Sequence, residues 1–386
     1  MKLRLLLVMF VLVMAQVVFA QDFSLYGNGA RAAGMGYAFT GIADDATAIS
    51  WNPAGLTQLM TMEASLVGRF GFGSLSTKYS DINPTTEIGS SFNLNFASFV
   101  FPFKLGQNNA VAGIAYRRVY NNTEKMSIKF SDFDYEYTID NKGGVDAISP
   151  SVGFQINDMI SVGATLNILM GSTDFNDKES YPGYLSESKY SEDYSGTTVE
   201  LGVLVKPSPQ ISLGADFKLP YTVKVDESWD GGSDSYNLEF PMFFDLGAGF
   251  RATDNLTLAA DYRIHPVKDL KVDGEKLFGS DADVTGNSIH VGLEYFMQTG
   301  QNVMPLRVGY FTFPTSTFDI NGDQVTYNGL SAGLGLIMGN FILDGAFEWL
   351  FKTYPGDTDY ATGDDVNYTY NNFRITIGAV IHFGEK

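Results

Sequence analysis

The chain has 386 residues, of which 45% are hydrophobic, 14% are aromatic, 41 are Gly and none is Cys, and its formal net charge is −19. Phosphate backbones repel so acidic a chain, which argues against nucleic-acid binding. The apolar fraction excludes a disordered chain, and the lack of Cys excludes disulfides, thiolate nucleophiles and thiolate metal sites.

Residues 1–20 have the pattern of a secretory signal peptide. Lys2 and Arg4 give a positive start, an apolar stretch follows, and the small residue Ala20 precedes Gln21. We therefore expect an exported chain; the alternative is an N-terminal membrane anchor. No later stretch of about 20 apolar residues follows, so we expect no membrane-spanning helix in the rest of the sequence.

Residues 21–60 lack the alternation of strands and are rich in Gly and Ala. Asp44 or Asp45 is suited to cap a short helix over 46–51, which Pro53 and Gly55 would then end. The segment is therefore predicted to be a small, compact element without strands.

In the remaining sequence, apolar and polar residues alternate with a period of two, which is the pattern of strands with two different faces. In the stretch 340–352, for example, Leu343 and Phe347 share one face, and Asp344 and Glu348 share the other. The pattern predicts fourteen strands, at 61–72, 90–103, 109–121, 144–157, 159–175, 196–206, 210–227, 236–251, 255–267, 285–298, 304–313, 326–338, 340–352 and 370–384.

The connections between these strands alternate strictly in length. Six are tight turns rich in Gly, Asn, Asp and Pro, and the other seven are mostly longer and polar. Outer-membrane barrels have short turns on the periplasmic side, long loops outside and an even number of strands. We therefore predict an all-β fold, a closed 14-stranded antiparallel transmembrane β-barrel at 61–386 in the outer membrane of a Gram-negative-type bacterium. The alternative is a soluble all-β protein.

A barrel of this width cannot be filled by its own side chains, so we expect residues 21–60 to form a helical plug in the lumen. The alternative is a periplasmic tail. The stretch GARAAGMGYAFTGIADDATAISWNPAGL in this segment resembles the N-terminal signature of the FadL-like outer-membrane transporters, which are long-chain fatty-acid and aromatic-hydrocarbon channels. The matching positions are Gly34, Gly36, Ala43, Asp44, Asp45, Ala46, Thr47, Asn52, Pro53 and Ala54. The rest of the chain matches that family in architecture alone.

The resemblance implies passive uptake of hydrophobic molecules. A ligand would be captured at the outer face, held in an apolar lumenal pocket, and released when the plug shifts or through an opening in the wall. Asp44, Asp45, Asn52, Pro53 and Ala54 would then belong to the plug and its gate. The implied partners are outer-membrane lipids and a hydrophobic small-molecule ligand.

One departure from the family concerns the wall opening, which the family ties to a kink in the third strand. The predicted third strand, 109–121, contains no Pro. Related plug-and-barrel proteins also act in type IX secretion, so a partner role in secretion machinery is an alternative function. A general diffusion porin is another.

The predicted inward faces carry many charged residues, which form either a clamp for a ligand or a cross-strand charge network. For a fatty carboxylate, Arg is better suited than Lys because it binds in a bidentate manner. Arg117, Arg307 and Arg374 are the candidates for this contact. Pro150 is the candidate for a break in the wall, because Pro cannot donate to a strand ladder; the alternative is an ordinary bulge.

The sequence predicts neither an enzyme nor a bound cofactor. An acyl hydrolase needs Ser and His positioned together, and the sequence has His265, His290 and His382 alone, so no catalytic triad is predicted. The acidic loop at 356–365 is either a Ca²⁺ site or solvated charge, and we favour solvated charge, so no metal site is predicted.

Overall fold

The computed structural model describes residues 27–77, 84–130, 134–278, 283–300, 302–358 and 365–384. The predicted signal peptide lies outside these ranges. Among the described residues, no helix is both long enough and apolar enough to cross a membrane.

Among the described residues, three short helices come first, and strands make up most of the rest. The helices are α2 (Ala30–Gly34) and the 3-10 helices η1 (Ala46–Ser50) and η2 (Pro53–Gln58), with a further 3-10 turn, η4 (Val267–Asp269), among the strands. The first strands are β1 (Met62–Thr77), β2 (Thr85–Leu105), β3 (Asn108–Asn121), β4 (Glu124–Phe130), β5 (Tyr135–Gln155), β6 (Ile160–Tyr181), β7 (Tyr184–Ser208), β8 (Ile211–Lys218), β9 (Tyr221–Trp229) and β10 (Gly232–Phe240). They are followed by β11 (Phe243–Thr253), β12 (Leu256–Ile264), β13 (Lys271–Val272), β14 (Glu275–Lys276), β15 (Ser288–Thr299), β16 (Asn302–Phe318), β17 (Gln324–Met338), β18 (Phe341–Thr358) and β19 (Asp365–Phe383).

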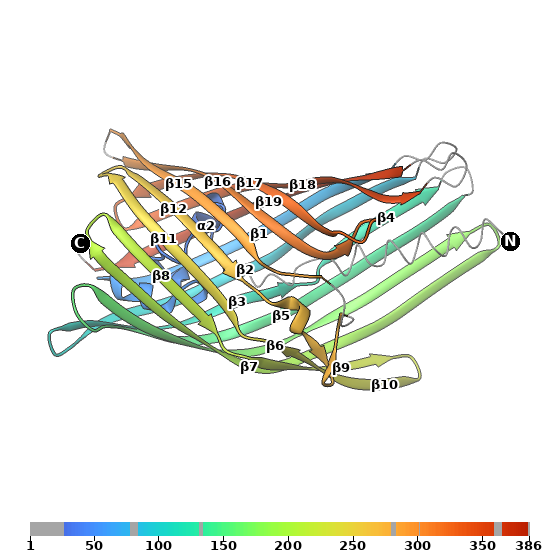
Figure 1. Cartoon of the computed structure of the whole chain (residues 1–386), viewed down its shortest axis with the longest axis horizontal. Coiled ribbons are helices and arrows are strands. Elements are labelled where there is room, and N and C mark those ends of the chain that lie inside the picture. The colour runs from blue at the N-terminus through green and yellow to red at the C-terminus, as the bar shows by residue number, and fades with distance from the viewer. Residues whose placement is uncertain are drawn as a thin grey trace.

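These strands form one antiparallel sheet that closes on itself, because β1 pairs with β19 (Figure 1). Three pairs of segments, β3 with β4, β8 with β9 and β10 with β11, are each the two halves of one spanning strand. The short segments β13 and β14 pair with each other within the connection from β12 to β15. Within the described ranges the sheet therefore has fourteen spanning strands, which confirms the predicted 14-stranded barrel.

The outer surface carries a belt of exposed apolar side chains, one or more on every spanning strand. Members of this belt, in chain order, are Leu66, Phe99, Ile114, Val152, Leu166, Leu201, Leu213, Leu246, Leu258, Val291, Leu306, Leu334, Leu343 and Ile377. Neighbouring aromatic rings lie toward the two ends of the belt, with Phe99 near Phe383 at one end and Trp349 stacked near Phe373 at the other. An apolar band between aromatic girdles is the surface that a bilayer covers.

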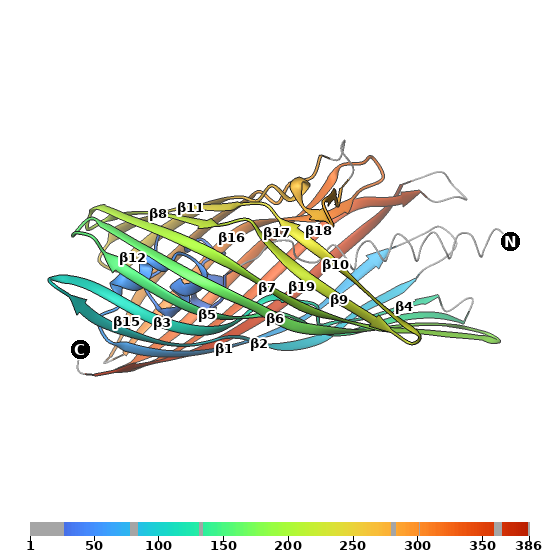
Figure 2. The same ribbon diagram turned by 90° about the horizontal axis from the view of Figure 1, so that it is seen from below.

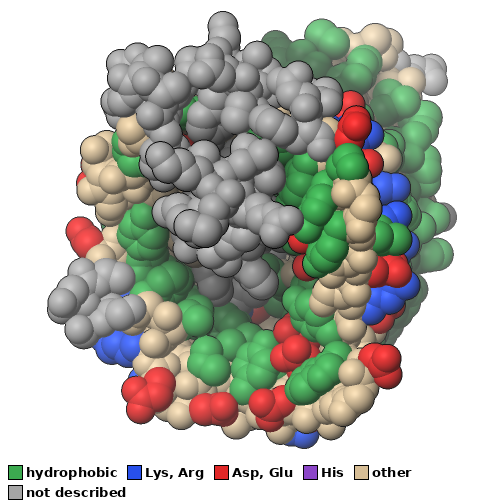
Figure 3. Space-filling model, turned by 90° about the vertical axis from the view of Figure 1, so that its right-hand side faces the viewer, with side chains coloured by type: hydrophobic (Ala, Val, Ile, Leu, Met, Phe, Trp, Pro, Cys, Tyr) green, Lys and Arg blue, Asp and Glu red, His purple; other side chains and the backbone are tan. Residues whose placement is uncertain are grey.

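The long connections differ from the sequence prediction, because many of them continue as regular strand. The predicted loop at 176–195 lies almost wholly within the paired hairpin of β6 and β7, which turns at residues 182–183. Beyond the bilayer both faces of a strand meet water, so the alternation that reveals a strand disappears while the pairing continues. Acidic side chains line the rim of the barrel at the end opposite the C-terminus (Figure 3).

Two prolines face each other where the seventh and eighth spanning strands each break. β9 starts at Tyr221 opposite Phe240, and β8 ends at Lys218 opposite Phe243. Pro220 and Pro241 therefore lie at the same height, where neither can donate a ladder hydrogen bond. The ladder resumes in the same register on both sides of this break.

The three N-terminal helices lie inside the barrel, at the end where the C-terminus and the short turns are found (Figure 2). Most of the residues from 27 to 59 are fully buried there, among them Tyr37, Phe39 and Trp51. We call residues 27–60 the plug. Because short turns mark the periplasmic side of such barrels, the plug fills the periplasmic half of the lumen.

Candidate functional site: the plug and the interrupted wall

The barrel wall meets the plug at glycines that face inward. A Cβ added at Gly309 would lie 2.1 Å from the Gly36 nitrogen, and one at Gly202 would lie 2.2 Å from Oδ1 of Asn52. Side chains do not approach other atoms this closely, so only Gly fits. Further wall glycines in such contact with the plug are Gly163, Gly214, Gly247, Gly249 and Gly292. This steric fit fixes how deep the plug sits.

Asn52, which is fully buried, joins the plug to the wall. Its Nδ2 donates to the carbonyl oxygens of Thr40 and Val203, each at 3.0 Å, and its Oδ1 accepts from the Ala54 nitrogen at 3.1 Å. Pro53 follows as the first residue of η2, a position that suits its missing N–H. The expected helix over 46–51 does end before Pro53, since η1 has its C-cap at Trp51, and Pro53 then begins a second short helix that was not predicted.

Of the two aspartates that were candidates to cap the plug helix, one caps it, and both lie within ion-pair distance of Arg31. Asp45 caps η1, because its Oδ1 accepts from the Thr47 nitrogen at 2.9 Å, whereas Asp44 forms an ion pair with Arg31. Burial raises the pKa of Asp45 above its ordinary value, while Arg31 and Thr47 act in the opposite direction. The start of η1 thus holds a partly buried carboxyl group in place.

A chain of ion pairs ties α2 to three wall strands. Glu294 of β15 accepts from Arg31 at 2.9 and 2.8 Å and from Arg307 of β16 at 2.7 Å. Arg307 also reaches Asp344 of β18 at 2.5 Å. The wall members of this chain are buried, and removal of one partner from a buried pair costs about 3–5 kcal/mol. The ion pairs therefore hold the plug firmly.

Other inward carboxylates bind the backbone of the plug directly. Oδ2 of Asp261 accepts from the nitrogens of Phe39 and Thr40, both at 2.8 Å, and Oε1 of Glu63 accepts from the Ala46 nitrogen at 2.9 Å. Many of the predicted inward charges thus serve to seat the plug, a role that the alternation of the strands alone does not reveal.

The wall is interrupted between β2 and the strand that β3 and β4 make. β2 pairs with β3 as far as Phe96 and resumes pairing with β4 at Ile88. No ladder pair joins residues 89–95 to residues 118–125, all of which the structure describes. We call these two facing stretches the wall interruption. On its other side β2 stays paired with β1, with a register shift near each end of the stretch.

Glycine in the neighbouring strand lets the third spanning strand fold inward at this point. Gly144 of β5 has a φ of 150°, and a Cβ there would lie 2.2 Å from the Tyr120 oxygen. Asn122, between β3 and β4, donates from Nδ2 to Thr173 at 2.9 Å and to the Tyr194 hydroxyl at 3.0 Å. Both partners are buried on the lumen side. The third spanning strand therefore breaks without a Pro. Gly144 leaves room for its backbone, and the hydrogen bonds of Asn122 hold the break in place.

The wall interruption lies at the depth of the bilayer. Phe92 and Leu94, which belong to it, point outward with exposed fractions of 68% and 38%. Phe92 is in register with Phe70 of β1, whose ring packs near that of Phe72 in the aromatic girdle farther from the plug. The interruption therefore meets the outer leaflet rather than water alone.

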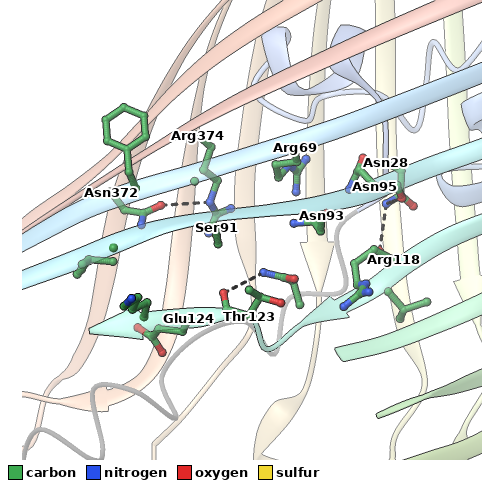
Figure 4. A pocket seen from close by; sticks show the side chains of 17 residues that line it. Asn28, Arg69, Ser91, Asn93, Asn95, Arg118, Thr123, Glu124, Asn372 and Arg374 are labelled. Atoms are coloured by element: carbon green, nitrogen blue, oxygen red, sulfur yellow. Dashed lines mark hydrogen bonds between the residues drawn. The ribbon is translucent and has the colours of Figure 1, made fainter. Parts of the chain in front are cut away.

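A cavity of about 80 Å³ opens at the wall interruption (Figure 4). Its polar lining residues are Asn28, Arg69, Ser91, Asn93, Asn95, Arg118, Asn121, Thr123, Glu124, Lys125, Asn372 and Arg374. Space of this size holds several water molecules. The resemblance implied an apolar pocket, and apolar surface does line the lumen beside the break, where Val119 and Tyr120 pack on a cluster that includes Val145, Leu169 and Phe243.

Of the three arginines considered for a ligand carboxylate, Arg374 lines this cavity, and its guanidinium lies 5.7 Å from the centre of the Phe313 ring. Arg117 instead pairs with Glu200 at 3.1 Å, and Arg307 belongs to the ion-pair chain of the plug. Sequence alone did not separate these roles, because all three side chains face inward.

Pro150, the candidate for a break in the wall, lies in β5 in register with Ile114 of β3. The pairing of β5 with β6 skips Ser149 and Pro150 and resumes in the same register. The wider interruption lies instead between β2 and the third spanning strand. Two signals in the sequence mark the site: the Gly143–Gly144 pair, and the recurrence of an outward aliphatic residue followed by Gly, as in Leu201–Gly202.

Known proteins share this architecture. A model of the outer membrane protein β-barrel domain matches residues 117–296. No curated protein matches the chain.

Three solved structures share the fold. A Pseudomonas aeruginosa FadL homologue is 16% identical, with 92% of this chain and 98% of that chain covered and a TM-score of 0.63. The Ralstonia pickettii toluene transporter TbuX is 16% identical, with 94% and 100% covered and a TM-score of 0.61. The P. putida toluene transporter TodX is 14% identical, with 94% and 100% covered and a TM-score of 0.65. The resemblance read from the plug motif is confirmed at the level of the fold.

Proposed function

We propose that this chain, an outer-membrane β-barrel with the FadL-like fold, is a channel for passive uptake of hydrophobic compounds such as long-chain fatty acids, with the lumenal plug as its gate. The observation that carries this proposal is the wall interruption at bilayer depth. The solved structures of similar fold are a FadL homologue and toluene transporters, which supports the same class of ligand.

The plug argues against a straight path for polar solutes. Its backbone is packed against wall glycines and its polar groups are bonded to wall carboxylates, so the periplasmic half of the lumen is filled. A general diffusion porin needs a continuous wet pore. A lateral path through the wall does not require the plug to leave.

The lumen offers such a path to an apolar molecule. The apolar cluster that includes Val145, Leu169, Val223 and Phe243 faces the lumen next to the inward fold of the third strand. From there the wall interruption leads to outward residues that face lipid, such as Phe92. A hydrophobic ligand gains free energy at both ends of this route, at about 25 cal/mol for each Å² of apolar surface removed from water.

A ligand with a carboxylate would meet Arg374, and we place the carboxylate contact there. Arg374 lines the cavity together with Arg69 and Arg118, so the lining carries three guanidinium groups. Guanidinium groups bind carboxylates in a bidentate manner. Replacement of Arg374 by Gln is expected to reduce oleate uptake several-fold while toluene uptake, which involves no carboxylate, stays unchanged.

Uptake of labelled oleate and labelled toluene by cells with and without the protein tests the function. We expect deletion to slow uptake of at least one of the two and re-expression to restore it. Unchanged uptake of both ligands would contradict the proposal. Failed export of a cargo protein in the same deletion strain would instead support the alternative role as a secretion partner.

A reversible disulfide across the wall interruption tests the lateral route itself. A Cβ on Gly89 would lie 3.0 Å from the Cβ of Lys125, so Gly89→Cys with Lys125→Cys places two thiols near the spacing of a disulfide. The native chain has no Cys, so no other thiol competes. We expect oxidation to stop uptake and reduction to restore it, with each single variant as the control. Full uptake by the oxidised double variant would refute a lateral route that needs Gly89 and Lys125 to separate.

A further inference from the structure

Asn28 of the plug lies at the periplasmic end of the wall interruption, where the ladder of β2 and β3 stops. Its Nδ2 donates to the Asn95 oxygen of β2 at 2.9 Å and to the Arg118 oxygen of β3 at 3.1 Å (Figure 4). The last ladder pair below them is Phe96 with Arg117. The Asn95 and Arg118 carbonyl oxygens therefore lie where the next ladder pair would be. The Asn28 side chain donates to both of them, in place of the backbone N–H groups of a paired strand.

The same residue is fixed to the body of the plug. The Asn28 nitrogen donates to Ser50 Oγ at 3.0 Å, and its oxygen accepts from Nε1 of Trp51 at 2.8 Å. The neighbouring Gly29 nitrogen donates to Oδ1 of Asn95 at 3.2 Å. Asn28 is 1% exposed, so water does not replace these bonds while the plug is seated. Any shift of η1 away from the wall must pull the Asn28 amide from one or both carbonyls.

We propose that Asn28 is a latch that couples the position of the plug to the width of the wall interruption. With the plug seated, the amide bridges residues 89–95 of β2 and the facing residues 118–125, which we call the two lips of the interruption, and holds them together at Asn95 and Arg118. When the plug moves, the bridge breaks and the lips are free to part. The plug then gates the lateral route from a distance, without leaving the lumen. The role of the latch in transport rests on the proposed function. The coupling between the position of the plug and the width of the interruption does not.

The cavity supports this reading. Its volume of about 80 Å³ admits water but is small for a lipophilic ligand, so the lips must part before such a ligand can pass. The lips also come together at the far end of the interruption, where Gly89 of β2 approaches Lys125 of β4. The side held by Asn28 is therefore the one that a movement of the plug releases.

The width of the interruption can be measured with spin labels, independently of transport. Leu94→Cys and Lys125→Cys place labels on exposed positions of the two lips, in a chain with no other Cys. Asn28→Asp keeps the size of the side chain but removes both donors and sets a carboxylate against two carbonyl oxygens. Loss of two hydrogen bonds of ordinary net strength corresponds to about a ten-fold shift in population toward longer distances between the labels.

The matched control is Asn109→Asp. Asn109 also donates from Nδ2 to two plug carbonyls, those of Thr57 at 2.6 Å and Leu59 at 3.2 Å, but it does not touch the lips. We expect this variant to leave the distance between the lips unchanged. Labels at Val308 and Leu330, on β16 and β17, report on a continuous part of the wall and should not move in either variant.

Coupling is tested by moving the plug from its far side. Gly309→Val displaces the plug near Gly36, and we expect it to lengthen the distance between the lips while Asn28 is intact and to add little once Asn28→Asp is present, since coupling is reciprocal. Asn28→Ala serves if the Asp variant does not fold. An unchanged distance in the folded Asn28 variants, or an equal change in Asn109→Asp, would overturn the latch. Slower oleate uptake with an unchanged distance would leave the proposed function standing and refute the latch alone.

Discussion

Substitution of Gly309 by Val is the most direct test of how the wall holds the plug. The new Cβ would lie 2.1 Å from the Gly36 nitrogen and 2.5 Å from the Gly36 Cα and the Met35 carbonyl carbon. Ordinary contact begins at 3.4 Å, so the backbone of the plug must retreat by about 1.3 Å. Because the clash is with backbone on both sides, no side-chain rotation relieves it.

The retreat breaks hydrogen bonds as well as packing. The Gly36 nitrogen donates to Ser331 Oγ at 3.0 Å, and its oxygen lies 2.9 Å from Nδ1 of His290. A shift of this size takes both beyond bonding distance. Overpacking costs about 1–3 kcal/mol, and each of the two lost bonds adds about 1 kcal/mol, so the seated plug is expected to lose about 3–5 kcal/mol.

Single-channel conductance in planar bilayers measures the result. We expect Gly309→Val to raise the open probability at least ten-fold over the native protein, while migration on gels before and after heating confirms that the barrel is folded. Gly345→Val is the control, because a Cβ there meets no atom closer than 4.0 Å. A folded Gly309→Val barrel that conducts no more than the native one would refute the inference that the inward wall glycines fix the position of the plug. Gly309→Ala repeats the test with a smaller change.

Three further changes probe the same region. Glu294→Gln leaves Arg31 and Arg307 without their shared carboxylate and should lower the stability of the seated plug by about 3–5 kcal/mol, measured as increased proteolysis within residues 27–60. Asp261→Ala removes the acceptor of two plug N–H groups and should raise conductance, and Asp261→Asn, which retains an acceptor oxygen, should raise it less. Pro150→Ala should leave oleate uptake within two-fold of the native rate, because Pro150 lies outside the wall interruption; a larger loss would return the opening to β5.

Much of the fold can be predicted from this sequence because a bilayer imposes a simple rule on each strand. Leu343 faces lipid and Asp344 faces the lumen, so the alternation is written residue by residue. Strict alternation of short and long connections then sets the number of strands and the orientation of the barrel. The strand extensions at 176–195 escaped prediction because water on both faces removes that contrast.

The site could be predicted only in part. Inward charge was visible in the sequence, but whether an arginine seats the plug, as Arg307 does, or lines the cavity, as Arg374 does, depends on which strands and plug residues surround it. The break in the third strand was hidden for a similar reason. It arises from Gly144 in another strand and from the anchoring of Asn122 on β6 and β7.

The sequence by itself thus determined the class of fold, the membrane it suits and the presence of a compact N-terminal segment, because each of these follows from local patterns of polarity. The tertiary structure alone decided where the strand ladder of the wall is interrupted and what holds the plug. Both depend on contacts between residues that are far apart in the chain, such as Gly36 with Gly309 and Asn28 with Arg118. Such contacts form only when the barrel closes, and no local pattern encodes the distances they require.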